Sequence, residues 1–172
     1  FATVGGGLAN QASETSTFIG GGENNRALGT FSAICGGSGN SAVGGFAAVT
    51  GGQANNAKGS LSFIGGGWLN LVSASGTSAF VGGGESNEAG GMFTVVPGGV
   101  HNSATGSLAN VAGGFRNSAT ALASCVGGGS WNIAGSAWVT IGGGRSNVAS
   151  AEYATIAGGQ ANVASGSYTT IG

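Results

Sequence analysis

Gly158-Gly159-Gln160-Ala161-Asn162-Val163-Ala164 is one copy of a pattern, Gly-Gly-x-x-Asn-x-Ala, that recurs through the whole chain. The asparagines of successive copies are fifteen residues apart, except for one interval of seventeen between Asn70 and Asn87. Eleven copies without an omission indicate a stack of equivalent structural units rather than a single globular core.

The composition restricts the choice of fold and of partner. Among 172 residues there are 40 glycines and one proline, and each glycine in a helix interior costs about 1 kcal/mol, so a helical bundle is excluded. Four basic and five acidic residues form no basic patch, so nucleic acid is not an expected partner. No apolar run reaches the roughly 18 residues of a membrane span, so no membrane insertion is expected.

A single copy, Tyr153–Gly166, shows how one unit is built. Its first four residues favour β-structure, the glycines form a corner, a second extended piece centres on Asn162, and Ser165-Gly166 makes a second turn. We therefore predict an all-β parallel β-solenoid, or β-roll, of about eleven 15-residue coils, with two strands of four or five residues in each coil. It forms one repeat array over residues 1–172, and the two extra residues near 72–76 should protrude as a bump without breaking the stack.

The period-two alternation of strands sorts the columns of the repeat into inside and outside. The residue two before Val or Ile is small, and the residue two after Asn is Ala in ten copies and Val72 in the other, so both columns should point inward. Between them, six residues before each Asn, lies a β-branched core ladder: Val4, Ile19, Ile34, Val49, Ile64, Val81, Val96, Val111, Val126, Ile141 and Ile156.

The asparagines should form a column of their own on the same inward face. Stacked carboxamides can hydrogen-bond to the copies above and below, as in cross-β assemblies; the alternative is that each side chain caps its own corner by bonding the local backbone. This Asn ladder comprises Asn10, Asn25, Asn40, Asn55, Asn70, Asn87, Asn102, Asn117, Asn132, Asn147 and Asn162.

Large apolar residues recur nine positions before Asn, on the face expected to point outward. Where Ser16 and Ser78 take this place, Phe18 and Phe80 follow two residues later, so we expect the aromatic group to be displaced within one stripe. A row of exposed apolar groups this long is best explained as a surface that another chain covers. The predicted self-association stripe is Phe1, Phe18, Phe31, Phe46, Leu61, Phe80, Phe93, Leu108, Trp138, Tyr153 and Tyr168.

Groups suited to catalysis or metal binding do not converge in the sequence. His101 stands at a variable position expected at the solvent edge, and there is no Asp, so we expect no catalytic site, no metal site and no cofactor. Cys35 and Cys125 lie six repeats apart, about 29 Å at strand spacing, too far for an intrachain disulfide. Buried or half-buried free thiols are expected, with a bond between chains as the alternative.

The pieces Ser32-Ala33-Ile34, Ala154-Thr155-Ile156 and Ala164-Ser165-Gly166 resemble the head repeat of trimeric autotransporter adhesins, the YadA-like family. The resemblance covers the whole chain and implies a left-handed β-roll, three chains packed side by side, and exposure at a cell surface.

The expected function is that of an extracellular structural fibre or adhesin shaft or head that associates with copies of itself. The copies would form a trimer or an end-to-end filament, and a host or matrix receptor is the other expected partner. Both ends fall in the same phase of the repeat, which suggests a window of a longer array. A viral or phage tail-fibre segment is the alternative, and an ice-binding solenoid is less favoured because its column of Thr residues is interrupted, for example by Phe63.

Overall fold

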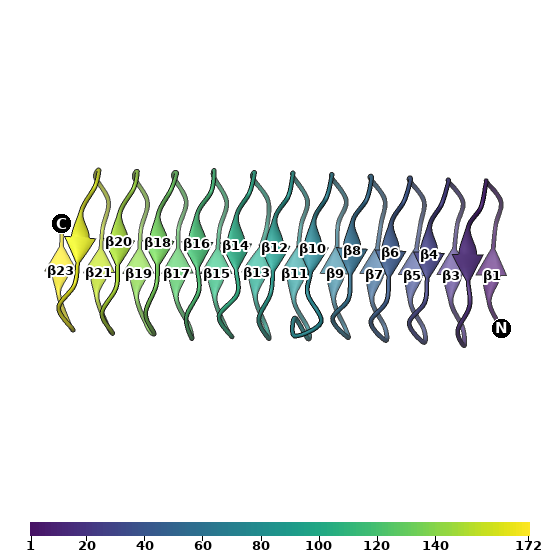
Figure 1. Ribbon diagram of the computed structural model, residues 1–172, viewed down its shortest axis with the longest axis horizontal. Helices are drawn as coiled ribbons and strands as arrows, with labels where there is room; N and C mark the ends of the chain where they lie inside the picture. The colour runs from purple at the N-terminus through teal and green to yellow at the C-terminus, as the bar shows by residue number, and fades with distance from the viewer.

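The chain is a straight rod built from parallel β-strands that coil around one narrow core. The computed structural model describes every residue from 1 to 172, and successive coils stack along the long axis with the two termini at opposite ends (Figure 1). None of its segments is a helix of the length and apolarity that a bilayer crossing requires. The predicted parallel β-solenoid of about eleven coils is confirmed.

Two parallel sheets form the broad faces of the rod. The odd sheet has twelve strands: β1 (Thr3–Val4), β3 (Phe18–Ile19), β5 (Ala33–Ile34), β7 (Ala48–Val49), β9 (Phe63–Ile64), β11 (Phe80–Val81), β13 (Val95–Val96), β15 (Asn110–Val111), β17 (Cys125–Val126), β19 (Thr140–Ile141), β21 (Thr155–Ile156) and β23 (Thr170–Ile171). The even sheet has eleven: β2 (Gln11–Ala12), β4 (Arg26–Ala27), β6 (Ser41–Ala42), β8 (Asn56–Ala57), β10 (Leu71–Val72), β12 (Glu88–Ala89), β14 (Ser103–Ala104), β16 (Ser118–Ala119), β18 (Ile133–Ala134), β20 (Val148–Ala149) and β22 (Val163–Ala164).

Each strand is two residues long, so the expectation of four or five was wrong. The physical reason is the backbone at the two turns of each coil. From Ser16 onward the residue nine before each Asn has a left-handed φ between 52° and 61°, and the glycine three before each Asn has φ between 82° and 95°. These conformations bend the chain out of the strand direction immediately on either side of the ladder.

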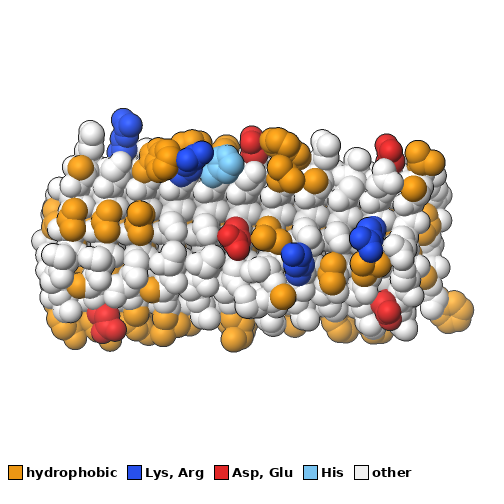
Figure 2. All heavy atoms as spheres, viewed as in Figure 1, with side chains coloured by type: hydrophobic (Ala, Val, Ile, Leu, Met, Phe, Trp, Pro, Cys, Tyr) orange, Lys and Arg blue, Asp and Glu red, His pale blue; other side chains and the backbone are white.

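Two edges therefore separate the sheets. We call the turns that lead from an odd strand to the next even strand, such as residues 142–147, the glycine edge. The turns that lead from an even strand to the next odd strand, such as residues 150–154, are the aromatic edge. Figure 2 views the even sheet, with the glycine edge above and the aromatic edge below.

The two inserted residues change one turn of the aromatic edge and nothing else. Phe80 pairs with Phe63, and Leu71 with Glu88, in the register used elsewhere. The wider loop is visible between β10 and β11 in Figure 1. Instead of simply standing away from the rod, it folds over the next coil, where the hydroxyls of Ser73 and Ser75 donate to the Gly90 carbonyl at 3.1 and 2.5 Å.

The core is one apolar column with smaller residues on either side. Each Val or Ile of the core ladder from Ile19 to Ile156 is fully buried, whereas Val4 in the first coil is 44% exposed. The inward Ala column is likewise buried from Ala27 to Ala164. Burial of each Val or Ile contributes about 1.5–3 kcal/mol, and every coil supplies one such residue to its neighbours.

Candidate self-association surface

The asparagine column holds the glycine edge together. At Asn102, Nδ2 donates to the carbonyls of Gly98 and Gly114, at 3.1 and 2.9 Å, and Oδ1 accepts from the Asn117 N–H at 3.0 Å. The carbonyl of Gly98 belongs to the same corner, and the other two groups belong to the next coil. The side chain thus caps its own corner and also ties two coils together, which combines the two arrangements considered from the sequence.

Direct bonds between carboxamides occur at five steps of the column, where Nδ2 donates to the Oδ1 of the preceding coil at 3.1–3.2 Å. The column is buried from Asn25 to Asn147, and Asn10 and Asn162 in the outer coils are half-buried. These polar groups are therefore satisfied within the rod, as a buried amide requires.

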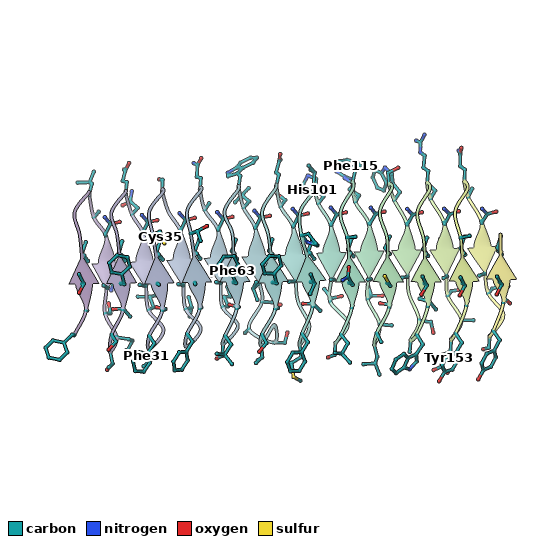
Figure 3. The ribbon with its side chains drawn as sticks, turned by 180° about the vertical axis from the view of Figure 1, so that it is seen from behind. Phe31, Cys35, Phe63, His101, Phe115 and Tyr153 are labelled. Atoms are coloured by element: carbon teal, nitrogen blue, oxygen red, sulfur yellow. The ribbon has the colours of Figure 1, made fainter.

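The aromatic edge carries a row of large side chains that lie outside the buried core. From Ser16 to Tyr168 the residue nine before each Asn position takes the left-handed conformation at the tip of the turn. Figure 2 shows hydrophobic side chains gathered along this lower edge, and Figure 3 shows Phe31 and Tyr153 there. We define the edge row as Phe1, Phe31, Phe46, Leu61, Phe93, Leu108, Trp138, Tyr153 and Tyr168, all of them 45% exposed or more.

Neighbouring members of the edge row stack on one another along the rod. The rings of Phe31 and Phe46 lie 5.0 Å apart at an interplanar angle of 13°, and those of Tyr153 and Tyr168 lie 4.9 Å apart at 5°. Stacking of this kind fixes the rings without covering their outer faces. The row is interrupted by short residues at Ser16, Ser78 and Ala123.

Phe18 and Phe80 do not belong to this row, so the prediction of one continuous stripe was wrong. They lie in β3 and β11 on the outer face of the odd sheet, together with Phe63, which is labelled in the middle of that face in Figure 3. The left-handed residue at the turn interrupts the inside–outside alternation. Residues nine and seven before Asn therefore lie on different surfaces.

The three Phe residues of the odd sheet share a feature that separates them from the edge row. Each is followed, two residues later, by a glycine: Gly20, Gly65 or Gly82. The Phe80 ring lies over Gly82, 3.3 Å from where a Cβ on that glycine would be, and it stacks on Phe63 at 5.6 Å. The Phe80 ring thus covers the glycine backbone of its own coil, and the Phe-x-Gly spacing is the sequence signal that distinguishes the three residues from the edge row.

A second aromatic group lies on the glycine edge. The Arg116 guanidinium sits 4.7 Å from the centre of the Trp131 ring and 5.3 Å from that of Phe115, within cation–π range. The His101 ring meets Phe115 edge-on at 6.2 Å. The sequence predicts a solvent edge for His101, and the residue is exposed there.

Titratable and metal-ligating side chains remain dispersed over the rod. No three His, Cys or acidic residues come together. Both cysteines are free. Cys125 in β17 is half-buried as expected, but the expectation was wrong for Cys35, which follows the inward Ile34 at the end of β5 and is exposed. Burial raises the pKa of the Cys125 thiol above its ordinary value.

Comparison with models of known protein families finds no match, and no curated protein matches the sequence either. The assignment that the structure supports is the fold itself, a parallel β-solenoid of about eleven coils. The likeness of Ala154–Ile156 and Ala164–Gly166 to adhesin head repeats therefore stands on those short segments alone.

Proposed function

We propose that this protein is a structural rod, of the extracellular fibre or adhesin type, whose copies associate side by side through the edge row. The observation that carries the proposal is the length of that row, in which nine large side chains, each at least 45% exposed, recur along the aromatic edge with interruptions at Ser16, Ser78 and Ala123. Exposed apolar surface of this extent is rare on proteins that work as monomers and marks an interaction site.

The internal construction of the rod suits a mechanical role. Every coil hydrogen-bonds to the next along both sheets and through the Asn column, so the same contacts recur along the length. A stack held by nearest-neighbour contacts gains stability with each coil and presents a regular flank to a partner. That flank is what a fibre needs for lateral association.

The extracellular or cell-surface location rests on the resemblance of the repeat to adhesin heads. A tail-fibre segment of a virus or phage would use the same rod and the same edge, and a receptor on a host or matrix would bind to the assembled fibre. An ice-binding role would instead use the odd sheet, where Thr140, Thr155 and Thr170 are aligned on β19, β21 and β23.

Light scattering of the purified protein tests the proposal. We expect a mass of at least twice the 16.1 kDa of one chain. The double variant Phe46→Ser/Tyr153→Ser should be monomeric. The matched control Phe115→Ser/Trp131→Ser removes two exposed aromatic residues from the glycine edge and should associate like the parent. A parent that is monomeric at all concentrations contradicts the proposal, and thermal hysteresis in that monomer would favour ice binding.

A further inference from the structure

We infer that two copies of this chain pair antiparallel along their aromatic edges, in one register that sets the coil of Ser78 opposite the partner's coil of Ala123. The inference rests on the proposed self-association and adds the direction and alignment of the partner. It depends on the order of large and short residues along the edge, together with the position of the inserted loop.

Each coil places one residue at the tip of the aromatic edge. We call this position a layer, and the layers differ in the size of that residue. Reading along the rod from Phe31, three large residues are followed by Ser78, then by Phe93 and Leu108, then by Ala123, and then by three more large residues, Trp138, Tyr153 and Tyr168. The order is symmetric about the midpoint between Phe93 and Leu108. An antiparallel two-fold axis at that midpoint therefore places each large residue from Phe31 to Tyr168 opposite a large residue of the partner, and each short residue opposite a short one.

In this register, large side chains meet large side chains throughout the overlap. The two short positions lie opposite each other, and the turn that leads to Ser78 is the one that carries the two inserted residues, with Ala74 and Ser75 exposed. The facing pairs, one residue from each copy, are Phe93 with Leu108, Ser78 with Ala123, Leu61 with Trp138, Phe46 with Tyr153, and Phe31 with Tyr168.

Parallel pairing of the same edges is less favourable for two reasons. With the copies in register, each inserted loop would face the identical loop of its partner, so the exposed Ala74 and Ser75 would meet their own counterparts, whereas in the antiparallel register each loop faces the short Ala123 layer. In addition, the exposed Glu152 beside Tyr153 would lie in the same layer as its own counterpart, and like charges brought together repel. The antiparallel register places Glu152 in the layer of Phe46 and Gly45.

The apolar area on the edge is sufficient for a stable pair. The eight large residues of the overlap are 45% to 75% exposed. With about 150–250 Å² per large side chain, they present about 800 Å², close to the ~800 Å² per partner of a standard interface.

Cysteine cross-linking tests the register in a background where the native thiols are removed, Cys35→Ser/Cys125→Ser. In that background we compare Leu61→Cys alone, Trp138→Cys alone, and an equal mixture of the two under oxidising conditions. Leu61 and Trp138 lie five coils apart on one rod, about 24 Å at strand spacing, whereas a disulfide requires Cα atoms within about 7 Å. We expect disulfide-linked dimers in the mixture and none with either variant alone. A mixture of Leu61→Cys with Leu108→Cys, two coils out of the inferred register, should not cross-link.

Each other outcome overturns the inference. Dimers from both single variants alone indicate parallel pairing in register, whereas dimers from only one of them, or from Leu61→Cys with Leu108→Cys, indicate another register. An associated protein that cross-links in no combination uses a different surface. In these cases light scattering still reports association and the proposed function stands, whereas a monomeric background protein contradicts the proposed function itself.

Discussion

Replacing Asn102 with alanine removes the side chain that connects one corner of the solenoid to the next. The carboxamide donates to the carbonyls of Gly98 and Gly114 and accepts from the Asn117 N–H. Asn102 itself is fully buried and does not have a left-handed backbone, so alanine fits the local conformation. The substitution therefore tests the hydrogen bonds and little else.

The expected cost comes from the groups left without a partner. The Gly114 carbonyl keeps its bond from the Val100 N–H at 3.0 Å, so it remains satisfied. The Oδ1 of Asn87 loses the bond from Asn102 Nδ2 at 3.2 Å but keeps the one from the Asn102 N–H at 3.0 Å. The Asn117 N–H and the Gly98 carbonyl lose their partners. A buried polar group left unpaired costs about 1–3 kcal/mol, so the free energy of unfolding should fall by about 2–4 kcal/mol.

The measurement is best made in the Phe46→Ser/Tyr153→Ser variant, because association would otherwise add to the apparent stability. Urea unfolding followed by circular dichroism gives the overall change, and hydrogen exchange at the Asn117 amide gives the local one. Asn10→Ala is the matched control: its two donated bonds at the first coil are exposed, and only the part-buried Asn25 N–H loses its partner, so it should cost about 1 kcal/mol less than Asn102→Ala. Equal costs for the two variants, or an Asn117 amide that stays fully protected, would refute the role assigned to the column.

Two further predictions concern single sites. Gly144→Ala should destabilise the rod by more than ~2 kcal/mol, because φ is 88° there and the new Cβ would overlap the Gly159 carbonyl oxygen. The control is Gly143→Ala, where a Cβ meets nothing within 4 Å and the melting temperature should change little. Similar melting temperatures for the two variants would contradict the close approach at Gly144. In alkylation kinetics, Cys125 should react more slowly than Cys35, because burial raises the pKa of the Cys125 thiol and lowers its thiolate fraction. The Cys125 rate should keep rising as the pH passes about 8.5, the ordinary thiol value; a rate that levels off there argues against the raised pKa.

The core could be predicted from the sequence because its cause is purely periodic. Ile141 and Ile156 are fifteen residues apart, and that spacing alone makes them partners in neighbouring strands. Burial is then expected because this column is β-branched and apolar in every copy. The same reasoning predicts the Ala column on the other sheet, where Ala149 pairs with Ala164.

The outer surface could be predicted only in part, because it depends on φ angles that the side-chain pattern does not encode. Phe46 and Phe63 look alike under a period-two rule, yet Phe46 has φ of 58° and lies at the tip of a turn, whereas Phe63 lies in a strand. The prediction of strand length was wrong for the same reason. The glycine corners could be predicted from the sequence, because a repeated Gly before Asn indicates a backbone conformation that other residues do not adopt readily.

The one-coil translation that relates all pairing partners also governs how such a molecule can vary in length. Excising residues 103–117, for example, would bring Asn102 next to Ser118, which stands where Ser103 stood, and each remaining strand would again have an equivalent neighbour. Duplications and deletions of forty-five nucleotides in the gene therefore preserve the register of every strand, whereas other sizes must be absorbed within one turn, as the two residues inserted near 72–76 are. Length becomes a quantity that changes in whole steps, and the distance from the inserted loop to Ala123 determines which shortened molecules can still pair with the parent.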